Sequence, residues 1–161
     1  MKTLLLYVLV LLNCSSKNYH TATNETVSGK VNKIVDGDTF DILTDKKTTI
    51  RIRMNGIDCP ERKQNYYKVC KDALGSYIFG KQVQLITQGT DQYKRTIADV
   101  YVGNNYINLQ MIANGYAWHY KKYSKDGVLA KAEVEARYNK LGLWQLLNPL
   151  APWDFRNSKK H

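Results

Sequence analysis

The fold is decided by residues 39–54, TFDILTDKKTTIRIRM. Apolar and polar side chains alternate along residues 48–54, as they do in a strand with one buried face. The apolar positions of this strand are Ile50, Ile52 and Met54. Residues 39–43 form the strand before it, and a short polar loop joins the two. The segment predicts a β-hairpin that carries Arg51 and Arg53 on its non-core face.

Further strand patterns lie on both sides of this hairpin. Residues 31–35 are rich in β-formers and end at the turn Asp36-Gly37-Asp38. Residues 82–87 and 95–102 follow later in the chain, and a turn after the second of them leads to residues 106–107. The sequence therefore predicts about five short strands.

Helical patterns are interleaved with these strands and follow them. The helices are expected at residues 65–79, 108–114 and 128–141. Their buried faces are Cys70, Leu74 and Ile78 in the first helix, and Leu129, Ala132 and Ala136 in the third. Residues 148–155 are interrupted by proline and rich in aromatics, so we expect them to lie as a strap on the body. Together the elements predict an α+β domain with a small β-barrel.

Composition and charge narrow the function classes. With 161 residues, 43% of them hydrophobic and 24% charged, the chain is typical of one globular domain. This composition excludes wholesale disorder and a multi-span membrane protein. Lys and Arg number 24 against 14 Asp and Glu, a net charge of +10. Such a positive field favours polyanionic partners, above all nucleic acid.

The N-terminus has the pattern of an export signal. A basic start is followed by the apolar run of residues 3–12, which is too short to span a bilayer comfortably. We expect a signal peptide at residues 1–14 and a flexible tether at 15–27, which is rich in Ser, Thr and Asn. The protein is therefore expected to be exported.

Two processing routes are open for this signal. The sequence before Cys14 is similar to a bacterial lipobox, which would make Cys14 a lipidated N-terminus and anchor the protein in the cell envelope. Cleavage after Ser16 or Ala22 would release a freely secreted protein instead. Cys59 and Cys70 remain after processing, and their spacing does not determine whether they pair.

Acids and arginines are the candidates for chemistry. Asp36 and Asp38 flank a glycine at a turn, and Asp58 and Glu61 bracket Cys59-Pro60. Such loops can gather oxygen ligands for a divalent cation. Arginines on half-buried strands are a sharper signal because guanidinium groups bind phosphate bidentately. These arginines are Arg51, Arg53 and Arg95. Each motif alone is more often a solvated turn or surface charge.

The motifs gain weight from their combination and order. The chain contains VDGDT at 35–39, RMNGIDCPE at 53–61 and DQYKR at 91–95, and then NLQMIANGYAW at 108–118. In this order and spacing they resemble the staphylococcal nuclease (thermonuclease) family over residues 28–156, leaving residues 157–161 as a basic tail. The resemblance implies an OB-fold, a five-stranded β-barrel with three α-helices. It also implies a Ca²⁺-dependent nuclease.

The resemblance assigns the metal site to the two acidic loops. Asp38 and Asp58 match the family's two calcium-ligating aspartates. The backbone carbonyl of Cys59 takes the position of a further ligand, and Asp36 matches a nearby second acid. Bound Ca²⁺ would neutralise the phosphodiester and draw it into place.

The resemblance also assigns catalytic and substrate residues. Glu61 matches the general base for the attacking water, and Arg53 and Arg95 match the arginines that bind the scissile phosphate. The residues expected to contact substrate are Tyr93, Lys94, Tyr120 and Tyr123. Tyr120 and Tyr123 are alternatives for one pocket tyrosine, and Lys94 replaces the glycine of the family's Tyr-Gly-Arg.

The resemblance implies an endonuclease acting on DNA and RNA that leaves 3′-phosphate ends. Single-stranded substrate is expected to be favoured and sequence specificity to be low. We expect a monomer. The alternatives are a non-catalytic OB-fold nucleic-acid-binding protein at the cell surface and a binding module for acidic polymers. The complete set of acids and arginines favours the enzyme.

Overall fold

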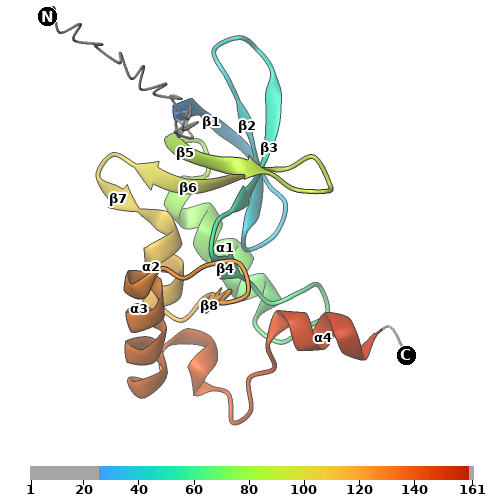
Figure 1. Ribbon diagram of the computed structural model, residues 1–161, viewed down its shortest axis with the longest axis vertical. Coiled ribbons are helices and arrows are strands. Elements are labelled where there is room, and N and C mark those ends of the chain that lie inside the picture. Colours follow the sequence, from blue (N-terminus) through green and yellow to red (C-terminus); the bar gives the residue numbers. More distant parts are fainter. Residues whose placement is uncertain (1–25, 160–161) are drawn as a thin grey trace, which may run out of the picture.

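The computed structural model describes residues 26–159. The predicted signal peptide, Cys14 and residues 15–25 of the predicted tether lie outside the described residues. The described chain forms a β-barrel with helices gathered below it (Figure 1). No helix in residues 26–159 is long and apolar enough to cross a membrane.

The barrel confirms the predicted fold class. Its strands are β1 (Thr26–Ile34), β2 (Thr39–Leu43), β3 (Thr49–Met54), β5 (Gln82–Thr90) and β6 (Thr96–Val102). They are hydrogen-bonded in the order β3-β2-β1-β5-β6, and parallel pairing of β3 with β6 closes the barrel. The predicted hairpin is the β2–β3 pair, in which Phe40 lies opposite Ile52. Both side chains are fully buried because the alternating pattern turns them into the barrel.

Strand β1 is longer than the predicted residues 31–35. It begins at Thr26, so the last two residues of the predicted tether belong to the strand. Thr26 pairs with Ile86 of β5. Hydrogen bonding to this neighbouring strand makes the segment a strand, although its polar sequence does not predict one. Strand β5 likewise extends to Thr90 through an irregularity in its pairing with β6. Both corrections arise from pairing across the barrel.

Three short strands complete the sheets. Strand β7 (Asn105–Tyr106) forms the predicted hairpin with β6. Strands β4 (Ile57–Asp58) and β8 (Trp118–His119) pair with each other, and the sequence did not predict this pair. The pair places Asp58 opposite Trp118, which fixes the backbone on which one predicted metal ligand stands.

The described residues contain four α-helices rather than the predicted three. They are α1 (Tyr67–Ile78), α2 (Ile107–Ala113), α3 (Gly127–Tyr138) and α4 (Pro152–Ser158), and a 3₁₀ helix η1 (Gly142–Gln145) follows α3. The predicted faces of the first and third helices are buried. The predicted strap of residues 148–155 does pack on the body, but Pro152 begins a helix there that the sequence did not predict. Proline suits the first helical position, and Asp154 lies in the first turn.

A second hydrophobic cluster seats the C-terminal segment beneath the barrel. It consists of Trp118, Ala136, Leu143, Trp144 and Ala151. Its chain path needs glycine at two positions, Gly115 and Gly142, which both have positive φ and whose backbones touch. Leu143 N donates to the Gly115 carbonyl at 2.8 Å. This close approach turns the chain after α3 back toward the barrel and α4.

Candidate active site

Among the predicted metal, catalytic and substrate residues, all but Lys94 line one cleft. Its volume is about 2010 Å³, which exceeds the roughly 1,000 Å³ of large small-molecule pockets. The predicted residues that line it are Asp36, Asp38, Arg53, Asp58, Cys59, Glu61, Tyr93, Arg95, Tyr120 and Tyr123. A cleft of this size suits an extended polymer better than a compact small molecule.

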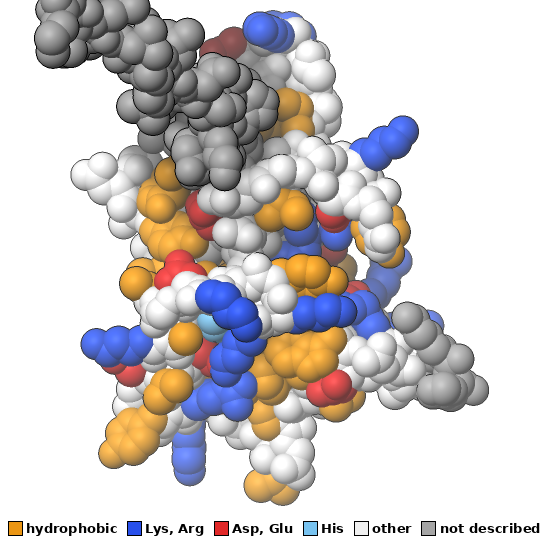
Figure 2. All heavy atoms as spheres, in the orientation of Figure 1, with side chains coloured by type: hydrophobic (Ala, Val, Ile, Leu, Met, Phe, Trp, Pro, Cys, Tyr) orange, Lys and Arg blue, Asp and Glu red, His pale blue; other side chains and the backbone are white. Residues whose placement is uncertain are grey.

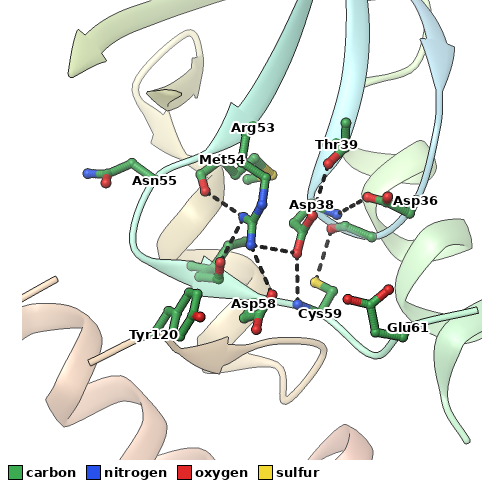
Figure 3. A network of polar contacts seen from close by, with 12 residues as sticks. Asp36, Asp38, Thr39, Arg53, Met54, Asn55, Asp58, Cys59, Glu61 and Tyr120 are labelled. Atoms are coloured by element: carbon green, nitrogen blue, oxygen red, sulfur yellow. Dashed lines mark hydrogen bonds and ion pairs between the residues drawn. The ribbon is translucent and has the colours of Figure 1, made fainter. Parts of the chain in front are cut away.

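Arg53 lies at the centre of the polar network (Figure 3). It stands near the end of β3, and its side chain is only 13% exposed. Nη1 donates to the carbonyls of Met54 and Ile57, each at 2.8 Å. Nη2 donates to Asp58 Oδ1 at 2.9 Å and lies 3.2 Å from Asp38 Oδ2. The guanidinium thus holds the two acidic loops together.

The turn before β2 presents Asp38 to this network. Asp38 is buried, and its Oδ2 accepts a 2.8 Å hydrogen bond from the backbone N–H of Cys59. Its Oδ1 accepts from the Thr39 hydroxyl at 3.1 Å. Asp36 accepts from the Asp38 backbone N–H, which shapes the turn. The structure therefore brings the two predicted metal-binding loops together.

Burial changes the acidity of two carboxyl groups in the site. Burial, assisted by the neighbouring charge of Asp38, raises the pKa of Asp36 to about 7. Burial also raises the pKa of Asp58 to about 6, although a hydrogen bond from Arg156 opposes the shift. Both shifts arise mainly from burial, which disfavours the ionised form of each carboxyl group.

The donor set fits a hard cation that completes its shell with water. Within residues 26–159, no group of three or more His, Cys, Asp or Glu side chains is arranged to hold a metal ion. Two carboxylates, Asp38 and Asp58, do lie on either side of Arg53 Nη2. Backbone carbonyls and water are normal further ligands of Ca²⁺, and carboxylate oxygens are ligands that this ion prefers.

Glu61 lies beside Asp58, on the loop after Pro60. Its side chain is 38% exposed. Its backbone N–H donates to Gln64 Oε1 at 2.9 Å, and its carboxylate Oε1 lies 2.6 Å from Arg156 Nη1. A partly exposed carboxylate at a cleft wall has access to water, as a general base requires.

The turn between β5 and β6 carries Tyr93, Lys94 and Arg95. Arg95 is held by Asp91, with Nη2 at 2.7 Å from Oδ2, and its Nη1 lies 3.5 Å from the Thr39 hydroxyl. Tyr93 is 71% exposed and lies beside the Arg95 guanidinium. Lys94 has a φ of 61°, the left-handed conformation that favours glycine. A glycine, which the family resemblance leads us to expect at this position, would adopt this conformation without strain.

Tyr120 and Tyr123 contact each other, with ring centroids 4.8 Å apart. Tyr120 lies next to Asp58 in the network (Figure 3), and its ring stacks on Trp153. Tyr123 is 67% exposed. Arg51, by contrast, lies outside the cleft lining and pairs with Asp41 at 2.8 Å. Arg51 and Arg53 lie on the same face of β3, two residues apart, so their different positions along the strand separate Arg51 from the site that Arg53 enters.

Arg156 is the site residue that the sequence reasoning missed. It comes from α4, lines the cleft and contacts both Asp58 and Glu61. The available signal was the stretch PWDFR at residues 152–156, in which a proline that can start a helix is followed by aromatics and arginine. The prediction of a strap did not include the helix that gives Trp153 and Arg156 a spacing of three residues.

Gly37 packs the acidic turn against two buried thiols. Cys59 and Cys70 are both free in this structure, and burial raises the pKa of each. A Cβ on Gly37 would lie 2.8 Å from Cys59 Cβ and 3.1 Å from Cys70 Cβ. Position 37 therefore has no room for a side chain, and it lies next to Asp38, a predicted metal ligand.

We expect Gly37→Ala to lower the free energy of unfolding by about 1–3 kcal/mol, since two packed elements must separate. Gly127→Ala is the matched control because a Cβ there meets open space, and it should stay within about 0.5 kcal/mol of the wild type. Urea unfolding followed by tryptophan fluorescence measures both. Equal stability of the two variants would contradict the packing argument.

Sequence comparisons agree with this geometry. A sequence model of the family described as "Staphylococcal nuclease homologue" matches residues 51–146. The match covers more than half of the chain and includes Arg53, Asp58, Glu61 and Arg95. The chain belongs to the staphylococcal nuclease family. Helix α4 lies beyond the range that the family model matches.

Individual relatives extend the similarity. An "Uncharacterized endonuclease" of Haemophilus influenzae is 36% identical over 158 residues, covering 98% of this chain and 85% of the relative. A "Micrococcal nuclease" of Shigella flexneri is 36% identical over 144 residues, covering 83% and 82%. A "Probable staphylococcal-like nuclease" of rice is 44% identical over 111 residues, 69% of this chain but only 30% of the relative.

Proposed function

We propose that this member of the staphylococcal nuclease family is a Ca²⁺-dependent endonuclease that hydrolyses DNA and RNA. The observation that carries the proposal is the convergence of Asp38, Asp58, Arg53 and Glu61 at one wall of an open cleft. Family membership and the nuclease names of several relatives support a nuclease, a hydrolase of phosphodiester bonds.

The acidic loops would hold the metal. Asp38 and Asp58, with the carbonyl of Cys59, are the groups that we propose as ligands of Ca²⁺. Bound there, the ion would supply positive charge that offsets the repulsion between a phosphodiester and an incoming hydroxide. Asp36 holds the backbone of Asp38 by a 3.1 Å hydrogen bond and so keeps that ligand oriented.

The remaining groups would accept the proton and stabilise the negative charge of the transition state. Glu61 would accept a proton from the attacking water, for which its partly exposed carboxylate is suited. Arg53 and Arg95 would bind the phosphate oxygens, where negative charge increases in the pentacoordinate transition state. Arg53 is held in advance by its two backbone carbonyl partners, so little reorganisation is needed. The proposed products end in 3′-phosphates.

Features of the cleft support single-stranded substrate and low sequence specificity. The rings of Tyr93 and Tyr123 are exposed and can stack on unpaired bases. Figure 2 shows lysine and arginine side chains gathered over the middle of the visible face. The lysines that line the cleft include Lys121, Lys122 and Lys125. Such contacts recognise phosphate rather than bases, and they make binding sensitive to salt.

The site of action is a separate proposal. The pattern of residues 1–14 supports export, followed either by free secretion or by a lipid anchor at Cys14. We propose that residues 28–156 act as one domain and that the protein is a monomer.

The test compares three substrates in the presence of Ca²⁺: heat-denatured DNA, duplex DNA and RNA. We expect the exported protein to shorten all three, the duplex most slowly, and to leave 3′-phosphate ends that block extension by a polymerase until a phosphatase removes them. Binding without any cleavage by the folded protein would favour the non-catalytic OB-fold alternative. Products with free 3′-hydroxyls would contradict the proposed reaction.

A further inference from the structure

Helix α4 inserts an arginine between two carboxylates of the cleft. Arg156 Nη1 lies 2.6 Å from Glu61 Oε1 and 3.3 Å from Asp58 Oδ1. Nη2 donates to Asp58 Oδ2 at 2.8 Å. One planar guanidinium therefore sets the position of the Glu61 carboxylate relative to that of Asp58, although 95 residues separate Arg156 from Glu61.

The same C-terminal segment also holds the backbone of the Glu61 loop. Gln64 Oε1 accepts from the Glu61 N–H, and Gln64 Nε2 donates to the carbonyl of Leu150 at 2.5 Å. Gln64 thus joins the Glu61 loop to the residues just before α4. Backbone and side chain of Glu61 are both tied to the C-terminal segment.

Aromatic packing fixes the helix that carries Arg156. The ring of Trp153, three residues earlier on α4, stacks on Tyr120 at 5.3 Å and 4°. Its edge contacts Trp118 of the second hydrophobic cluster at 5.5 Å. Pro152 and Ala151 are buried at the start of the helix. A helix of seven residues has little stability alone, so these contacts determine where Arg156 lies.

We propose that Arg156 is a positioning residue that holds the Glu61 carboxylate in the orientation needed to receive the proton of the attacking water. The proposal rests on the nuclease function proposed above. Glu61 stands on a loop with its side chain 38% exposed, where water would otherwise leave several rotamers open. A bidentate arginine restricts that freedom, and its charge keeps two neighbouring carboxylates from repelling each other.

Three variants of the full exported chain test the proposal, with kcat and KM measured on heat-denatured DNA in Ca²⁺. We expect Arg156→Ala to lower kcat by about 10–100-fold, as the loss of an orienting partner typically does, with KM changed by less than about threefold. Arg156→Lys should recover part of kcat because it restores the charge. Lys159→Ala, which removes a charge from the end of the same helix, should behave as the wild type; Lys159 contacts the Phe155 ring.

Two further readouts separate positioning from other roles. The thermal midpoint of Arg156→Ala should stay within a few degrees of wild type, and its affinity for single-stranded DNA in chelator should be unchanged within about threefold. A raised KM with unchanged kcat would overturn the proposal and make Arg156 a substrate contact. Wild-type kcat in Arg156→Ala would also overturn it. If Arg156→Ala unfolds, Arg156→Lys is compared with the wild type, and a folded Arg156→Lys with wild-type kcat decides against the proposal.

The two proposals fail in different ways. A wild-type protein that binds DNA and does not cut it removes the proposed nuclease and the positioning role together. A wild-type protein that cuts, with an Arg156→Ala variant that cuts equally well, removes the positioning role alone.

Discussion

Replacing Glu61 by glutamine is expected to lower hydrolysis of single-stranded DNA by about 10²–10⁴-fold, the range that general-base catalysis contributes. Glutamine keeps the size of the side chain and an oxygen that can accept from Arg156, but it cannot take a proton from water. Single-turnover cleavage in Ca²⁺ measures the effect. Affinity for DNA, measured in chelator, should be largely retained because Glu61 lies among acids and carries no positive charge.

The matched control is Glu135→Gln on α3. Glu135 is 61% exposed and forms a 3.7 Å ion pair with Lys131 on the same helix. The variant removes the same charge far along the chain from the acidic loops and should cleave as the wild type does. Near-normal cleavage by Glu61→Gln would contradict the proposed base role.

Replacing Arg53 by lysine should reduce hydrolysis by about 10²–10³-fold, as the loss of a preorganised charge-stabilising donor does. Lysine keeps the charge, yet an ammonium on a flexible chain cannot reproduce the contacts to two carbonyls and two carboxylates. The same loss leaves buried acceptors unsatisfied, so we expect the free energy of unfolding to fall by about 1–3 kcal/mol. Cleavage rates and urea unfolding measure the two effects.

Arg51→Lys provides the control on the same strand. Arg51 lies two residues before Arg53 and is 48% exposed, and it pairs with Asp41 outside the cleft lining. Its replacement should leave cleavage unchanged and alter stability by about 1 kcal/mol, because lysine keeps the charge opposite the buried Asp41 but loses one of the two hydrogen bonds. Equal losses of cleavage in both variants would show that Arg53 has no special place in the reaction.

The barrel and the helix faces were predictable because their signals are local. Alternation along residues 48–54 identified which side chains of β3 enter the core, and Ile52 and Met54 are buried there. Spacing of three and four residues identified the buried faces of α1 and α3. These periodicities follow from strand and helix geometry, so they are visible without any knowledge of partners.

The unpredicted parts depend on contacts between distant segments. The β4–β8 pair joins Ile57 to His119, and neither two-residue strand has a pattern of its own. Arg156 reaches Asp58 across 98 positions of the chain. Helix α4 is placed by aromatic packing on Tyr120 and Trp118 rather than by an apolar stripe. No periodicity within a single segment reports such contacts.

The site depends both on local sequence patterns and on contacts between distant segments. The two arginines of β3 look alike in the sequence, and only the surrounding loops separate Arg53 in the cleft from Arg51 at the surface. At Lys94 the family resemblance already indicated a position that suits glycine. The φ of 61° in the structure gives the physical reason for that preference. Motif order predicted the residues of the cleft, whereas the direction of each guanidinium required the fold.

The most direct measurement follows the strand length of heat-denatured DNA with the purified protein in Ca²⁺ and in excess chelator. Binding to the same DNA in chelator shows that the protein is folded and competent. We expect progressive shortening in Ca²⁺ and none in chelator, with activity restored when Ca²⁺ is returned in excess. Binding without shortening in Ca²⁺, or equal shortening in chelator, would contradict a Ca²⁺-dependent nuclease built on Asp38, Asp58 and Glu61.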